Sequence, residues 1–166
     1  MTETKNIADQ IINLARAQVG VKELTRNDSP KIKQYLASVG LYSPQSWCMA
    51  FVYWVSANIG FKTPLFKSGG VLAVWNKTPE AYKSKTPGYG FIGIIDKGKG
   101  FGHTFYVSGI NGINLKTIEG NTNLAGSSDA DSCLELNRRK TTDKIAGYIN
   151  LPQYLIDFNG IEQKKN

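Results

Sequence analysis

The sequence has few of the residues that hold metals or disulfide frameworks. It contains two cysteines, Cys48 and Cys133, and a single histidine, His103, in 166 residues. Two cysteines are too few for a disulfide framework, and neither belongs to a Cys-x-x-Cys pair. A zinc site would need unusual ligands, and we predict that the protein uses no metal and no cofactor.

Long apolar runs are also missing. No segment approaches the roughly 18 apolar residues of a membrane-spanning helix, so we expect no stable membrane insertion. The first ten residues are polar and lack the apolar core of a secretory signal peptide. We therefore expect the protein to be made in the cytoplasm, and to need a non-classical route if it acts in the periplasm or cell wall.

Basic residues outnumber acidic ones by 20 to 13, which gives a net charge of +7. Such a charge favours a polyanionic partner, for example nucleic acid, an anionic membrane or an anionic cell wall. The basic residues are scattered over separate loops and form no basic helix or aromatic–basic ladder, so we do not expect nucleic-acid binding. A hydrophobic content of 41% is typical of a globular domain. We predict one monomeric domain over 1–166, with a polar, frayed tail at 157–166.

The most informative stretch is the apolar run at 47–55, which leaves no helical face polar and predicts a buried helix. We place its start after Pro44, with Ser46 as N-cap, and its end at Gly60. Cys48 then lies in the first turn, where unpaired N–H groups and the helix dipole stabilise a thiolate. This position suits a nucleophile, although most buried cysteines are inert small hydrophobes.

The remaining patterns predict helices first and an antiparallel sheet afterwards, which is an α+β domain. Amphipathic spacing predicts two helices before Cys48, and apolar alternation with turn signals predicts strands after residue 90. The expected helices are 7–19, 30–39 and a short piece at 71–76. The expected strands are 91–95, 104–108, 115–119, 134–136 and 145–151.

His103 stands at the opening of the strand expected at 104–108, Glu119 ends the strand expected at 115–119, and Asn121 follows closely. Cysteine catalysis needs an imidazole to take the thiol proton, and a carboxylate or amide to orient the ring. Neighbouring antiparallel strands can bring His103 and Glu119 together. Each residue also has a plain structural interpretation, because a lone histidine is often structural and Glu119-Gly120-Asn121 can be a simple turn.

Two further groups receive structural interpretations only. Cys133 is predicted to be a spare thiol, and a disulfide with Cys48 is not expected, since it would silence the nucleophile. The run Arg138-Arg139-Lys140 is interpreted as a solvated loop that can contact wall anions or an acidic partner.

The order and local motifs resemble the CHAP amidase/peptidase domain, within the papain-like NlpC/P60 group. The resemblance spans about residues 10 to 125 and rests on Ser46-Trp47-Cys48-Met49-Ala50-Phe51-Val52, Gly102-His103-Thr104 and Glu119-Gly120-Asn121-Thr122. It departs from the usual pattern at Tyr89, where an acidic residue is common, and at Thr104, where an apolar one is.

This resemblance implies a papain-like fold and peptidoglycan as substrate. By similarity, Cys48 attacks an amide carbon, and His103 acts first as base and then as acid. Glu119 orients the imidazole, Asn121 polarises the site, and Trp47 shapes the groove and contacts the substrate. Muramoyl-alanine amidase and peptide endopeptidase activities share this constellation, so the bond that is cut stays open.

We interpret the chain as an interbacterial toxin effector that is injected by a secretion machine. A cognate immunity protein with acidic residues would then cover the Cys48 groove. One alternative is a phage lysin with the same chemistry. Others are a cysteine protease or isopeptidase acting on proteins, and a non-catalytic module that binds the wall.

Overall fold

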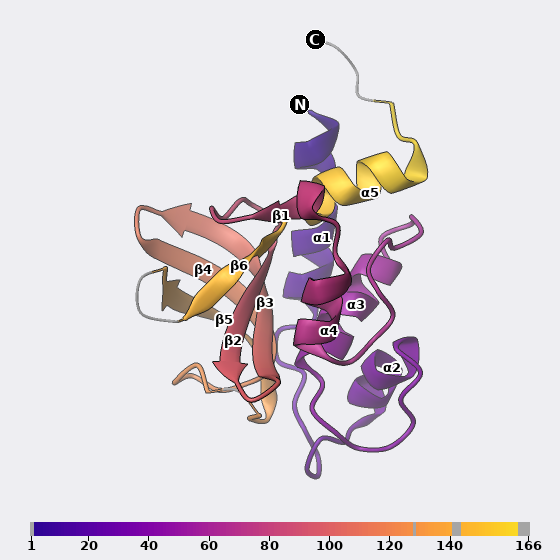
Figure 1. Cartoon of the computed structure of the whole chain (residues 1–166). Coiled ribbons are helices and arrows are strands. Elements are labelled where there is room, and N and C mark those ends of the chain that lie inside the picture. Colours follow the sequence, from indigo (N-terminus) through magenta and orange to yellow (C-terminus); the bar gives the residue numbers. More distant parts are fainter. Residues whose placement is uncertain (1, 128, 141–143, 163–166) are drawn as a thin grey trace.

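The computed structural model describes residues 2–127, 129–140 and 144–162, and it has the α+β architecture that the sequence predicts. Four helices come first and gather on one side of a single antiparallel sheet, and a fifth helix ends the described chain (Figure 1). The helices are α1 Glu3–Ala17, α2 Pro30–Ser38, α3 Cys48–Ala57, α4 Val71–Lys77 and α5 Leu151–Asn159, with a 3-10 turn at Glu80–Tyr82. The strands are β1 Lys83–Ser84, β2 Ile92–Gly98, β3 Phe101–Asn111, β4 Asn114–Thr122, β5 Ser132–Arg139 and β6 Ile145–Ile149.

The first two helices begin where local capping chemistry places them. The Thr2 hydroxyl accepts a hydrogen bond from the Lys5 amide at the start of α1. The Ser29 hydroxyl does the same for the Ile32 amide at the start of α2, and Pro30 occupies the first turn. The described helices include none that is both long and apolar enough to cross a membrane.

Helix α3 is buried, as predicted, but its ends differ from the expectation. Trp47 occupies the N-cap position, and no side chain caps the helix. The hydroxyl of Ser46, the expected cap, instead lies 3.3 Å from Oδ1 of Asp129, with which it forms a hydrogen bond. The helix ends at Ala57 with Asn58 as C-cap, ahead of Gly60. Burial of the apolar side chains therefore defines α3 more than capping does.

The sheet has the order β1-β6-β2-β3-β4-β5, and all neighbouring strands are antiparallel. It contains the five strands that the alternation predicts, and the two-residue β1 is an addition. Helix α3 packs against β3 and β4. The phenol of Tyr106 on β3 donates a hydrogen bond to the Val52 carbonyl of α3, with an O···O distance of 2.5 Å. These contacts hold α3 against the central strands.

The C-terminal part differs most from the sequence-based expectation. Strand β6 ends at Ile149, and α5 follows where we expected the strand to continue and then a polar tail. The Asn150 side chain caps α5, and its apolar residues are buried at Leu151, Pro152, Leu155 and Ile156. Leu151, Leu155 and Ile156 join one core cluster with α1, α2, α3 and the sheet. Residues 163–166 of the expected tail lie outside the described part of the chain.

Candidate active site

Cys48 is the first residue of α3 and lines a pocket of about 220 Å³. The first N–H groups of a helix have no partner within the helix, and they carry the positive end of its dipole. The residue as a whole is only 7% exposed, and it lies in the lining of this pocket. The other residues that line the pocket are Ser46, Lys97, Phe101, Gly102, Asn121 and Asp129.

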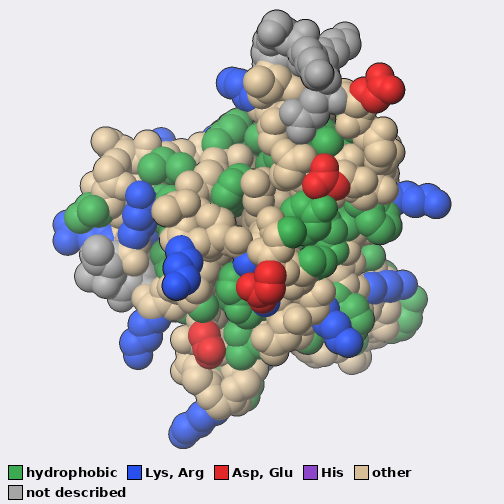
Figure 2. Space-filling model, turned by 45° about the horizontal axis from the view of Figure 1, so that its top comes forward, with side chains coloured by type: hydrophobic (Ala, Val, Ile, Leu, Met, Phe, Trp, Pro, Cys, Tyr) green, Lys and Arg blue, Asp and Glu red, His purple; other side chains and the backbone are tan. Residues whose placement is uncertain are grey.

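His103 and Glu119 meet as the strand pairing predicts. Nε2 of His103 on β3 lies 2.7 Å from Oε1 of Glu119 on β4. His103 is only 2% exposed, and no histidine is visible on the face drawn in Figure 2. Because Nε2 is engaged with Glu119, Nδ1 is the ring nitrogen left for Cys48, and this buried atom makes no hydrogen bond among the described residues. This arrangement orients the imidazole toward the thiol.

The three groups are coupled electrostatically. Burial by itself lowers the pKa of His103, but interactions with Cys48 and Glu119 outweigh burial and raise that pKa from 6.5 to about 9. Burial also raises the pKa of Glu119, and its bonds to Arg138 and His103 overcome this effect and lower the pKa to about 2. The geometry therefore favours a buried imidazolium–carboxylate pair next to the cysteine.

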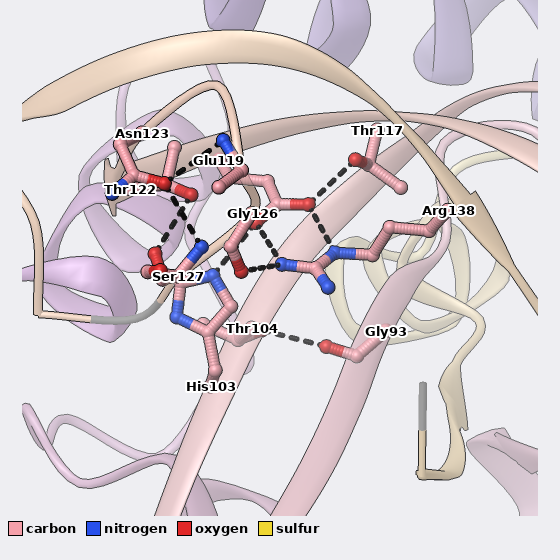
Figure 3. Close-up of polar contacts among 11 residues, drawn as sticks. Gly93, His103, Thr104, Thr117, Glu119, Thr122, Asn123, Gly126, Ser127 and Arg138 are labelled. Atoms are coloured by element: carbon pink, nitrogen blue, oxygen red, sulfur yellow. Dashed lines mark hydrogen bonds and ion pairs between the residues drawn. The ribbon is translucent and has the colours of Figure 1, made fainter. Parts of the chain in front are cut away.

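A second cation supports Glu119 from the opposite side. Nε of Arg138 on β5 lies 2.5 Å from Oε2 of Glu119, and Nη2 lies 2.7 Å from Oε1. The Thr117 hydroxyl donates to Oε2 as well, at 2.6 Å. Figure 3 shows the carboxylate held between His103 and the guanidinium. Every hydrogen-bonding direction of this buried carboxylate is used, which fixes its orientation.

The interpretation of Arg138 as part of a solvated loop is wrong, because its side chain is only 9% exposed. The sequence held a usable signal for this position. Strand alternation that starts from the buried Leu136 places residue 138 on the same face. A buried carboxylate also requires a cationic or hydrogen-bonding partner.

Asn121 lies beside Cys48 and holds the chain that leads into α3. Its Oδ1 accepts a hydrogen bond of 2.8 Å from the backbone amide of Trp47. The residue is buried and has a left-handed backbone, with φ at 58°. Asparagine tolerates this conformation better than most residues. Its Nδ2 is buried and makes no hydrogen bond within the described residues. The amide thus positions the residue just before Cys48.

Two glycines allow these strands to approach the helices closely. A Cβ at Gly120 would lie 2.7 Å from the Trp47 ring, and one at Gly102 would lie 2.8 Å from the Ile95 carbonyl oxygen. A side chain at Gly120 would push β4 away from Trp47 and Phe51, and one at Gly102 would push β3 away from Ile95 and from Val71 of α4. The glycines beside Asn121 and His103 thus have a packing role.

The expected substrate contact of Trp47 is wrong, because its side chain is fully buried. The indole N–H donates to Oε1 of Glu23 at 3.0 Å, and the ring stacks on Tyr35 with centroids 5.9 Å apart. Phe101, which is 70% exposed, is the aromatic residue that lines the Cys48 pocket. It directly precedes Gly102 and His103, and this adjacency was the signal available in the sequence.

The second cysteine is separate from this chemistry. Cys133 on β5 is buried and has a free thiol, and burial raises its pKa. Cys48 is free as well, so the two do not form a disulfide. Within the described residues there is no group of three or more His, Cys, Asp or Glu side chains placed to hold a metal ion.

Comparison with known proteins gives a family match over the centre of the chain. Residues 40–121 match the family model of the CHAP domain, a range that contains Cys48, His103, Glu119 and Asn121. No curated protein matches the sequence. Among solved structures, the crystal structure of Ly7917 is similar to this one, with a TM-score of 0.48 and 17% sequence identity. The similar region covers 87% of this chain and 62% of the length of that one.

Proposed function

Residues 40–121 form a CHAP domain, and from this premise we propose that the chain is a cysteine hydrolase that cleaves an amide bond in peptidoglycan. The CHAP domain indicates an amidase-type hydrolase of peptidoglycan. The observation that carries the proposal is the buried His103–Glu119 pair next to Cys48 at the start of α3. Cys48, His103 and Glu119 come from three different elements, α3, β3 and β4. In a thiol protease or amidase a thiol attacks, an imidazole transfers the proton and a carboxylate or amide orients the imidazole.

In the proposed first half-reaction, Sγ of Cys48 attacks the carbonyl carbon of the scissile amide. Nδ1 of His103 holds the thiol proton and transfers it to the leaving amine, so that the C–N bond breaks and a thioester remains. The negative charge that develops on the carbonyl oxygen is stabilised by N–H groups at the start of α3. Glu119 keeps the ring oriented and stabilises the imidazolium.

In the second half-reaction, water replaces the amine. His103 takes a proton from the water, and the resulting hydroxide attacks the thioester. The C–S bond then breaks, and the thiolate is released beside the imidazolium. All proton transfers use groups of this chain and water. The pocket at Cys48 is small and the thiol is buried within it, which favours a narrow peptide-like substrate over a bulky folded protein.

Digestion of purified peptidoglycan sacculi tests this proposal. Wild type, Cys48→Ala and the matched control Cys133→Ala are incubated with sacculi, and the released fragments are analysed by mass spectrometry. We expect fragments from wild type and Cys133→Ala and none from Cys48→Ala. The fragment masses then separate muramoyl-alanine amidase from peptide endopeptidase activity. Release by Cys48→Ala would contradict the nucleophile. No release by wild type would favour a protein substrate or a non-catalytic wall-binding module.

We further propose that the protein is an antibacterial effector that acts on the wall of a target cell and is blocked in its producer by an immunity protein. The net charge of +7 supports both parts, since it favours an anionic wall and an acidic partner over the Cys48 pocket. Expression directed to the periplasm should lyse cells, whereas cytoplasmic expression should not, and Cys48→Ala should be harmless in both. A small protein encoded beside this one should bind it and restore growth. If no neighbouring protein binds, a phage lysin becomes the better interpretation.

A further inference from the structure

We propose that Arg138 is a positioning residue, which fixes the Glu119 carboxylate and sets the pH range in which Cys48 and His103 are active. Only the hydrolysis readout of this inference rests on the proposed function. The family match ends at Asn121, so it does not extend to Arg138. The inference rests on contacts within this chain.

The first argument is geometric. The Arg138 guanidinium contacts both oxygens of Glu119, and Nη2 also donates to the Gly126 carbonyl oxygen at 2.9 Å. The planar fork of an arginine can make two parallel bonds to one carboxylate, whereas a lysine ammonium acts as a point charge. The guanidinium also lies 5.7 Å from the centre of the Phe105 ring, which helps to hold it in place. Arg138 therefore connects β5, the carboxylate on β4 and the segment at Gly126.

The second argument is electrostatic. In the active form, Cys48 and Glu119 carry negative charge, and His103 and Arg138 carry positive charge. The charges therefore alternate in the order Cys48, His103, Glu119, Arg138. Glu119 is fully buried, and without Arg138 its hydrogen-bonding partners among the described residues would be the His103 ring and the Thr117 hydroxyl. Several titratable or charged groups surround His103 and Glu119. They are Cys48 from α3, Arg138 and Cys133 from β5, and Lys97 and Asp129 in the lining of the Cys48 pocket.

The direction of the effect follows from charge alone. Cys48, His103 and Glu119 form one coupled group of titrating side chains. Removal of the positive charge of Arg138 makes each proton of this group harder to lose, so every apparent titration step moves to higher pH. A residue that only supported the fold would reduce the folded fraction and leave the titration midpoint in place. The pH profile therefore separates the two roles.

The test compares Arg138→Met, Arg138→Lys and the matched control Arg16→Met. Arg16 pairs with Glu135 of β5 at 3.0 Å on the surface, so Arg16→Met removes the same charge and one ion pair elsewhere on the same strand. Alkylation of Cys48 by iodoacetamide is followed by mass spectrometry as a function of pH. This readout needs no peptidoglycan. In parallel, kcat and KM for fragment release are measured for each variant.

We expect Arg138→Met to move the alkylation midpoint upward by roughly one pH unit. Arg138→Lys should leave the midpoint within about 0.3 units, since the charge is kept. Its kcat should fall about tenfold or more with KM unchanged, because the ring and carboxylate lose their fixed geometry. Arg16→Met should match wild type. An unmoved midpoint in folded Arg138→Met, or a wild-type kcat in folded Arg138→Lys, would overturn the proposal.

Thermal melting is measured first, because Arg138→Met leaves a buried carboxylate without its cation. If that variant does not fold, Arg138→Lys decides through its kcat: a fall of about tenfold with KM unchanged supports the positioning role, and a wild-type kcat overturns it. The two proposals fail in different ways. A shifted midpoint with no fragment release by any protein would refute the proposed function and support the role of Arg138. Normal hydrolysis with an unmoved midpoint would support the proposed function and refute the role of Arg138.

Discussion

The titration of His103 is the most direct physical consequence of the site. It is the only histidine in the sequence, so its ring signals in an NMR pH titration are free of overlap with other histidines. We expect a midpoint near pH 9, where an ordinary histidine titrates near 6.5, because Cys48 and Glu119 stabilise the imidazolium more than burial destabilises it.

The same shift predicts how stability changes with pH. The folded protein keeps the His103 proton up to about pH 9, whereas the unfolded chain loses it near 6.5. This contribution is therefore fully present below pH 6.5 and is lost as the pH rises through 9. A rise from 6.5 to about 9 corresponds to about 3 kcal/mol in the free energy of unfolding. Urea unfolding at a series of pH values between 6 and 10 measures it.

Two variants serve as controls for this titration. Glu119→Gln removes the carboxylate but keeps the positive charge of Arg138, so the His103 midpoint should fall below 6.5. Cys48→Ala should also lower the midpoint, because it removes the other group that favours the charged ring. A wild-type midpoint at or below 6.5, or a stability that does not change between pH 6.5 and 9, would refute the reasoning that the ion pair outweighs burial.

Three other changes test the surroundings of the site. Trp47→Phe should lower the free energy of unfolding by about 2 kcal/mol, because it removes the hydrogen bond to Glu23 and part of the ring packing. The kcat/KM of the folded protein should stay nearly unchanged, and a large loss of activity would contradict the core role of Trp47. Gly120→Ala should cost about 1–3 kcal/mol in a denaturant titration, because its Cβ would overlap the Trp47 ring, and a stability equal to wild type would show that the ring moves freely. A thiol reagent should label Cys48 in the native protein and Cys133 only after denaturation, since Cys133 is buried and burial raises its pKa. Labelling of both cysteines in the native state would show that β5 opens easily.

The elements near Cys48 could be predicted because local rules and burial agree there. The apolar run at 47–55 has no polar face, and Ser29 and Pro30 mark the start of α2. Helix α5 was missed for the opposite reason. Its first residues follow strand β6 without a break in apolar character, and only packing of its buried face into the core distinguishes a helix there from a longer strand.

The candidate site shows the same division. Residue types and order were enough to name Cys48, His103, Glu119 and Asn121 as candidates, because an activated thiol requires a base and an orienting group. The roles of Trp47, Phe101 and Arg138 were missed or reversed, since each depends on which way a side chain points. Alternation along a strand limits that choice to two faces, and the position of neighbouring elements selects one of them.

The sequence by itself determined the α+β class, the buried helix that begins at Cys48, and the candidate groups for cysteine chemistry. These follow from hydrophobic periodicity and side-chain chemistry, which are local properties. Only the tertiary structure decided that Arg138 lies on Glu119, that Trp47 belongs to the core, and that Asn121 holds the backbone ahead of Cys48. The Arg138–Glu119 contact joins residues 19 positions apart, and the Asn121–Trp47 bond joins residues 74 positions apart. No local pattern encodes which distant partners will meet.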